Sequence, residues 1–116
     1  MLKRSLAIKE RAYGRDHPKV ARTLSNLGTA YNDLGDHVKA RDMMERSLVI
    51  QERAYGGDHT RLAETLTTLG DVYRVLGDNA KARGVLERAF AINERAYGPD
   101  HPHTNMCQEA LAELAS

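Results

Sequence analysis

Histidine is the residue whose type and spacing in this sequence could do chemistry. His17, His59 and His101 each follow an aspartate, and His101 with His103 forms a His-x-His pair. Imidazole and carboxylate groups are common zinc ligands and common acid–base catalysts. The three Asp-His pairs belong to successive repeats 42 residues apart, however. If the repeats stack, the pairs lie about 10 Å from one another, whereas a zinc ion needs its ligands at about 2 Å. We therefore predict that these pairs begin helices and that the chain has no metal site.

Catalytic patterns of other kinds are missing from the sequence. Cys107 is the single cysteine, and we expect it to be an ordinary small residue of its helix. There is no glycine-rich phosphate loop and no Gly-x-Ser-x-Gly elbow, which are the local signatures of nucleotide binding and of serine hydrolases. We predict a protein that is not an enzyme and uses no cofactor. His37 is expected to be exposed to solvent.

The positions of these residues follow from an internal repeat. The segment Glu-Arg-Ala-Tyr-Gly begins at Glu10, Glu52 and Glu94, which is a constant step of 42 residues. When residues 6–47 are laid over residues 48–89, 23 of 42 positions are identical. A fixed period of this length is the sequence signature of a repeat architecture.

Composition limits the classes of partner. Lys plus Arg number 17 and Asp plus Glu number 16, for a net charge of +1, which argues against a surface dedicated to nucleic acid. No apolar run is long enough to cross a membrane. A single cysteine cannot form an internal disulfide and fits a reducing compartment. We predict a cytoplasmic protein that binds neither nucleic acid nor membrane.

Each repeat reads as a pair of helices. Apolar residues recur at steps of three and four, which is the period of one helix face: Val20, Leu24, Leu27, Tyr31 and Leu34. Asp16 and Pro18 are typical of a helix start, and Gly35 with Asp36 is typical of a stop followed by a new cap. We expect a helix of about 16 residues, a tight turn and a second helix of about 19 residues.

Seven positions of this pattern resemble the tetratricopeptide repeat family, in the longer form found in kinesin light chains. They are Leu24, Leu27, Gly28, Tyr31, Ala40, Met44 and Ser47, and Leu66, Leu69, Gly70, Tyr73, Ala82, Leu86 and Ala89 in the next unit. The resemblance implies an all-α fold: a right-handed α-solenoid of stacked antiparallel hairpins with about six helices. Gly28 and Gly70 would allow close helix packing.

The expected organisation is a single domain over residues 1–116. Residues 1–17 would be the second helix of a truncated repeat, 18–59 and 60–101 complete repeats, and 102–116 the first helix of a degenerate or truncated repeat. Because the chain begins in the middle of a repeat, we expect it to be a fragment or a short array with a cut edge.

The resemblance also implies a binding surface on the concave face, formed by the first helix of each hairpin. The ligand-facing positions would be Arg22, Ser25, Asn26, Thr29, Asn32, Asp33, Glu64, Thr67, Thr68, Asp71 and Arg74. Their side chains are polar and of mixed sign, a chemistry suited to an extended peptide or protein partner.

Three functions are compatible with the sequence. The first is a non-catalytic protein–protein interaction scaffold. The second is a structural array that self-associates through exposed repeat ends at Leu2, Leu6 and Ile8, where a helix has no hairpin partner. The third is a regulatory repeat fragment of a larger multidomain protein.

Overall fold

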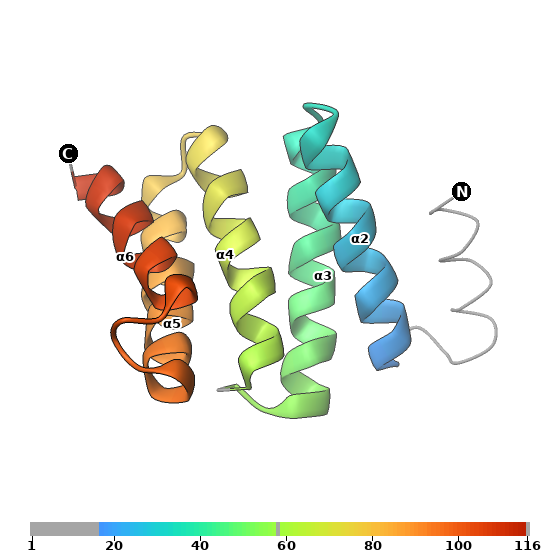
Figure 1. Cartoon of the computed structure of the whole chain (residues 1–116). Helices are drawn as coiled ribbons and strands as arrows, with labels where there is room; N and C mark the ends of the chain where they lie inside the picture. Colours follow the sequence, from blue (N-terminus) through green and yellow to red (C-terminus); the bar gives the residue numbers. More distant parts are fainter. Residues whose placement is uncertain (1–16, 58, 116) are drawn as a thin grey trace. The chain divides into compact units, whose positions relative to one another are not determined.

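A computed structural model describes residues 17–57 and 59–115, which form five helices. They are α2 (Pro18–Asp33), α3 (His37–Tyr55), α4 (Thr60–Val75), α5 (Asn79–Tyr97) and α6 (Pro102–Ala115), coloured in chain order in Figure 1. No strand occurs in these two ranges, so the all-α prediction is confirmed. The predicted sixth helix, with Leu2, Leu6 and Ile8, lies outside the described residues.

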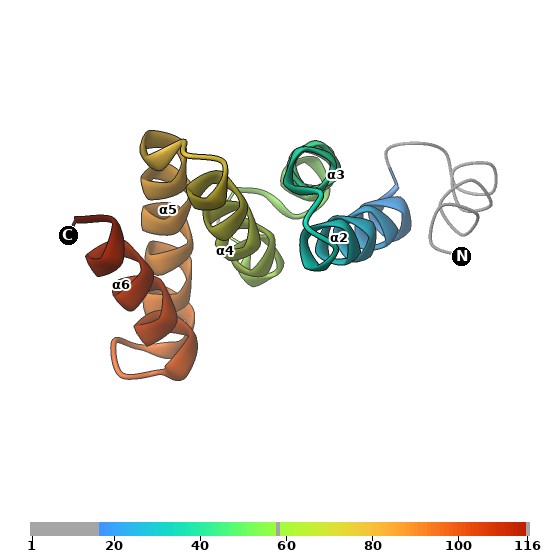
Figure 2. The same ribbon diagram turned by 90° about the horizontal axis from the view of Figure 1, so that it is seen from above.

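The helix lengths follow the repeat. The first helices α2 and α4 both have 16 residues, and the second helices α3 and α5 both have 19, as predicted. The chain divides into two compact units, Met1–Gly57 and Asp58–Ser116. In the first unit α2 packs against α3; in the second, α5 packs against both α4 and α6, as Figures 1 and 2 show.

The core of the first unit is built from the facing stripes of α2 and α3. Val20, Ala21, Leu24 and Ile50 form one buried cluster, and Met43 packs against it. Spacings of three and four residues place these side chains on one face of each helix. Leu34, the last member of the predicted stripe, is instead 81% exposed, because the helix ends at Asp33 and Leu34 is its C-terminal cap.

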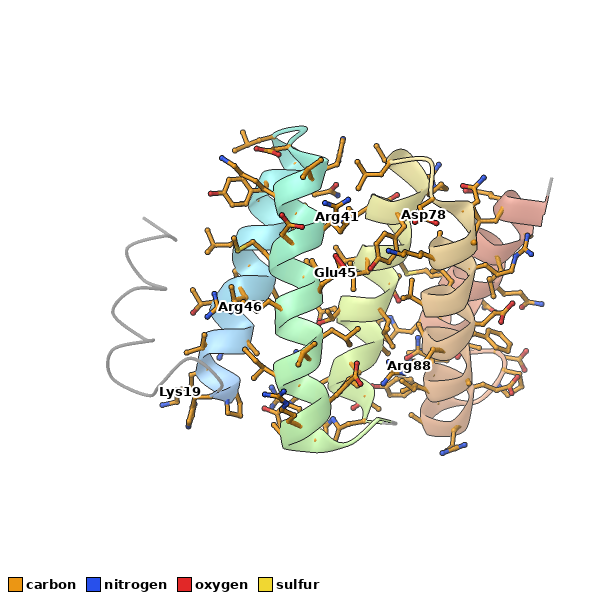
Figure 3. The ribbon with its side chains drawn as sticks, turned by 180° about the vertical axis from the view of Figure 1, so that it is seen from behind. Lys19, Arg41, Glu45, Arg46, Asp78 and Arg88 are labelled. Atoms are coloured by element: carbon orange, nitrogen blue, oxygen red, sulfur yellow. The ribbon has the colours of Figure 1, made fainter. Side chains whose placement is uncertain are left out.

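The turns between paired helices use glycine and aspartate as the sequence predicts. Gly35 and Gly77 have φ of +86°, a left-handed conformation that costs a residue without a Cβ little. Asp36 and Asp78 then cap α3 and α5, where they accept hydrogen bonds from the backbone N–H groups of Lys39 (3.3 Å) and Lys81 (3.2 Å). Asp78 is labelled at the start of α5 in Figure 3.

Two glycines let the paired helices approach. A Cβ on Gly28 would lie 2.8 Å from Met44 Cγ, and a Cβ on Gly70 would lie 2.6 Å from Leu86 Cγ. Both distances are shorter than carbon atoms tolerate. Each helix pair can therefore be close only because the first helix lacks a side chain there.

An ion pair lies on α3, where Arg41 Nε is 3.6 Å from Glu45 Oε1. Both residues are labelled in Figure 3.

The first helices are capped by histidine. His17 and His59 are the N-cap residues of α2 and α4, and each Nδ1 accepts a hydrogen bond from the backbone N–H two residues on, at 3.1 and 3.2 Å. The expectation that aspartate is the cap is therefore wrong for these helices; Asp16 and Asp58 lie outside the described residues. An Nδ1 that accepts belongs to an imidazole that carries no proton on that nitrogen.

We expect the replacement His59→Ala to lower the free energy of unfolding by about 0.5–2 kcal/mol, because the N–H of Arg61 loses its acceptor. His59→Ser should retain most of the stability, since a hydroxyl accepts a hydrogen bond at the same place. Urea denaturation followed by circular dichroism measures both variants. Equal stability of the alanine and serine variants would contradict a capping role.

Candidate functional site

The second unit contains a cavity of about 430 Å³ between α4, α5 and α6. Its size falls within the roughly 300–1,000 Å³ typical of ligand pockets. The lining residues are Thr60, Ala63, Glu64, Thr67 and Thr68 from α4, Asn93 and Tyr97 from α5, and His103 and Met106 from α6. The residues therefore come from three helices of one compact unit.

The polar lining residues of α4 lie on one face of that helix. Glu64, Thr67 and Thr68 are three and four residues apart and share one helix face. The Thr67 hydroxyl donates to the carbonyl of Ala63 at 2.7 Å, and the Thr68 hydroxyl donates to the carbonyl of Glu64 at 3.1 Å. Both hydroxyl protons are therefore used within the helix. The two hydroxyl oxygens can still accept hydrogen bonds through their lone pairs.

Asn93 and Cys107 connect α5 to α6 beside the cavity. Asn93 is only 5% exposed, and its Nδ2 lies 3.5 Å from both the carbonyl of His103 and Cys107 Sγ. Cys107 is buried, and its Sγ lies 3.7 Å from Thr67 Oγ1. The cysteine is thus part of the packing between α4, α5 and α6, as expected for a small residue of its helix.

An aromatic cluster lies where α5 turns into α6, and two of its members, Tyr97 and His103, line the cavity. The rings of Tyr97 and His101 are stacked with centroids 4.4 Å apart, and His103 lies tilted at 5.7 Å from Tyr97. His101 Nδ1 also accepts a hydrogen bond from the backbone N–H of His103 at 3.1 Å. The His-x-His pair is therefore engaged in ring packing and in capping α6. Within the described ranges, no group of three or more His, Cys, Asp or Glu residues could hold a metal ion.

The predicted site residues of the second unit separate into two sets. Glu64, Thr67 and Thr68 line the cavity. Asp71 and Arg74 are not among its lining residues and form an ion pair with each other, with Arg74 Nη2 2.8 Å from Asp71 Oδ1. The carboxylate of Asp71 thus neutralises much of the charge of Arg74 on the exposed surface of α4.

The predicted site residues of the first unit all lie on α2. Arg22, Asn26, Thr29 and Asp33 are exposed. Ser25 Oγ lies 2.6 Å from Ser47 Oγ, and the Ser47 hydroxyl donates to the carbonyl of Ala21 at 2.8 Å.

Asn32 is half-buried, and its Oδ1 lies 2.7 Å from His37 Nδ1. His37 is consequently half-buried as well, and the prediction that it is simply exposed to solvent is wrong. Ser25 and Asn32 therefore hold the hairpin of the first unit together.

Six lining residues were not predicted from the sequence: Thr60, Ala63, Asn93, Tyr97, His103 and Met106. A signal for Met106 was available, because it lies 42 residues after Glu64 and so occupies the same position in the next repeat. Asn93 and Tyr97 belong to a second helix, and no pattern of the first helices points to them. They enter the cavity because α6 packs against α5.

No described helix is long and apolar enough to cross a membrane. The described part of the molecule consists of repeated helical hairpins, with a cavity of mixed polar and apolar lining between helices of the second unit. This architecture defines the class of α-helical repeat proteins. The model of the tetratricopeptide repeat family matches residues 1–48, 21–94 and 67–116. The chain belongs to the tetratricopeptide repeat family.

Known structures agree with this assignment. A crystal structure from Podosopora anserina, described as a kinesin light chain with nearly identical TPR-like repeats, superposes with a TM-score of 0.90 at 24% identity, over 97% of this chain and 54% of that one. A second crystal structure, of a variant of the same protein, also has a TM-score of 0.90 at 24% identity, with coverage of 97% and 53%. BtubC (BKLC) from P. vanneervenii is 32% identical with a TM-score of 0.77, over 87% of this chain and 40% of that one.

The chain spans about half the length of the two Podosopora anserina structures. No curated protein matches the sequence. Repeats of this family generally mediate protein–protein interaction, and the fold is a typical non-enzymatic scaffold. The fold predicted from the seven repeated positions, a tetratricopeptide repeat solenoid of the kinesin light chain type, is thereby confirmed.

Proposed function

We propose that this protein is a non-catalytic interaction scaffold that holds an extended peptide, or an extended segment of a protein partner, on the concave face formed by the first helices of its hairpins. Family membership supports the general role. The cavity of about 430 Å³ carries the specific proposal, because its lining includes Glu64, Thr67 and Thr68, three residues that the resemblance marks as ligand-facing.

The chemistry of the cavity suits a peptide. Hydroxyl, carboxylate and amide groups lie beside Tyr97 and Met106, and a small number of polar groups among apolar ones is the usual composition of a specific pocket. Tyr97 is 46% exposed and Met106 is 55% exposed, so both can lose water when a partner covers them. Burial of about 25 cal/mol per Å² of apolar surface would then favour binding.

The test is a selection of peptides from a randomised display library on the 116-residue chain, followed by calorimetric titration of the selected peptides. We expect Thr68→Trp to weaken their binding at least about tenfold, because an indole ring fills space at the wall of the cavity. Glu87→Trp is the matched control: Glu87 is exposed on α5 and does not line the cavity, so binding should change by less than about twofold. Circular dichroism checks that both variants fold.

Two outcomes would contradict the proposal. In one, the library gives no peptide that binds saturably. In the other, the selected peptides bind Thr68→Trp as tightly as the original chain, which would place the partner elsewhere.

A further inference from the structure

Several of the polar residues that line the cavity offer hydrogen-bond acceptors. The hydroxyl protons of Thr67 and Thr68 are donated within α4, and the carboxylate of Glu64 has no proton to donate at neutral pH. Asn93 Oδ1 accepts no hydrogen bond from the described residues, while its Nδ2 is directed to His103 O and Cys107 Sγ. The hydroxyls of Thr60 and Tyr97 and the imidazole of His103 also line the cavity, and each can donate as well as accept.

Asn93 is the most informative of these groups because it is only 5% exposed and still lines the cavity. Every fully buried side-chain oxygen or nitrogen atom in the described residues has a hydrogen-bond partner. The Oδ1 atom, which accepts no hydrogen bond from the described residues, is therefore not fully buried. Because water can reach this oxygen, a ligand that donates a hydrogen bond to it would replace a water molecule there.

The helix starts beside the cavity add few donors. Backbone N–H groups at a helix N-terminus ordinarily attract anions. Here the N–H of Arg61 is taken by His59 Nδ1 and that of His103 by His101 Nδ1, while Pro102 has no N–H. The histidine caps therefore occupy N–H groups with which a carboxylate ligand would otherwise pair.

The lining of the cavity contains one acidic residue and no basic residue of the lysine or arginine type. Among the described lining residues, Glu64 is the only one ionised at neutral pH when histidine is neutral, and none of them is a lysine or arginine. Within the described part of the chain Glu64 takes part in no ion pair. The neighbouring helix α6 carries Glu109 and Glu113 and contains no lysine or arginine.

We infer that the cavity binds the side chain of a lysine or arginine in the partner peptide, an inference that rests on the proposed function. Ammonium and guanidinium groups donate hydrogen bonds and accept none, which matches the acceptor oxygens among the lining residues. Glu64 would form the charge-assisted bond, and Thr67, Thr68 and Asn93 the neutral ones. The ring of Tyr97 adds an aromatic surface that attracts cations.

The other classes of ligand fit less well. A carboxylate side chain would be repelled by the carboxylate of Glu64, and no lysine or arginine in the lining would attract it. An aliphatic side chain would bury Asn93 Oδ1 without a donor. A long cationic side chain satisfies both groups, and its methylene stem can lie against Met106.

The test uses three acetylated and amidated pentapeptides, each with four flanking alanines and a central arginine, glutamine or glutamate. They are titrated at pH 7 and low salt into the ¹⁵N-labelled 116-residue chain, and the backbone amide signals of Thr67, Thr68 and Met106 are followed by NMR. The arginine peptide is expected to shift these signals saturably. At the same concentrations, the glutamine and glutamate peptides should not reach half-saturation.

Variants of the chain identify the group responsible. Glu64→Gln has nearly the same shape and should weaken the arginine peptide about five- to tenfold, because it loses a charged acceptor. Glu87→Gln removes the same charge from an exposed site on α5 outside the lining, and should leave the affinity within about twofold.

Three results would overturn the inference: no saturable shift with the arginine peptide, tighter binding of the glutamate peptide, or unchanged affinity in Glu64→Gln. These results are distinguishable from failure of the proposed function. If library-selected peptides depend on Thr68 but contain no lysine or arginine, the cavity is a peptide site and only its specificity is misassigned. If no peptide depends on Thr68, the proposed site itself is wrong.

Discussion

Gly70→Val is expected to lower the free energy of unfolding by about 3 kcal/mol, the upper part of the range for overpacked cores. A Cβ at this position would lie 2.6 Å from Leu86 Cγ and 2.7 Å from Leu86 Cδ2. Leu86 is itself only 2% exposed, so it has little room to move. The valine must therefore push α4 away from α5 or force Leu86 from its rotamer. Urea denaturation followed by circular dichroism measures the loss.

Gly84→Ala is the matched control because Gly84 is an exposed glycine inside α5, and a Cβ there meets nothing within 4 Å. Alanine is a better helix former than glycine by roughly 0.8–1.0 kcal/mol, so this variant should be more stable than the original chain. If Gly70→Val and Gly84→Ala moved stability in the same direction, close packing at Gly70 would not be the reason that glycine is present.

Leu24→Ala is expected to lower the free energy of unfolding by about 2–5 kcal/mol, the usual range for truncating a buried leucine side chain to alanine. Leu24 is fully buried in the cluster with Val20, Ala21 and Ile50, and truncation would leave a void that the two helices cannot close completely. The measurement is again urea denaturation, with the slope of the transition compared to check that the same surface is exposed on unfolding.

Leu34→Ala should change stability by less than about 0.5 kcal/mol, because Leu34 is 81% exposed. Both leucines belong to the same apolar stripe in the sequence, but only Leu24 is buried. Comparing the two variants therefore tests whether burial, and not membership of the stripe, decides the effect on stability. A large loss at Leu34, or a small loss at Leu24, would show that the described core is not the one that stabilises the hairpin.

The local structure could largely be read from the sequence. Helix lengths of 16 and 19 residues, left-handed glycines at Gly35 and Gly77, and aspartate caps at Asp36 and Asp78 all follow from preferences that act over a few residues. The caps of the first helices were misread because aspartate and histidine are adjacent and both can accept a hydrogen bond. The backbone conformation at His17 and His59 decides which side chain reaches the helix N–H groups.

His17, His59 and His101 show where the information in the sequence ends. Sequence alone determined that they recur every 42 residues and therefore stand at helix starts, because a repeat fixes the position of each residue within its helix. It could not determine that Tyr97, His101 and His103 form one aromatic cluster, or that Asn93 faces a cavity between α4, α5 and α6. These contacts depend on how α6 packs against α5. The side chains of both helices together decide that packing, and the pattern along one helix does not contain this information.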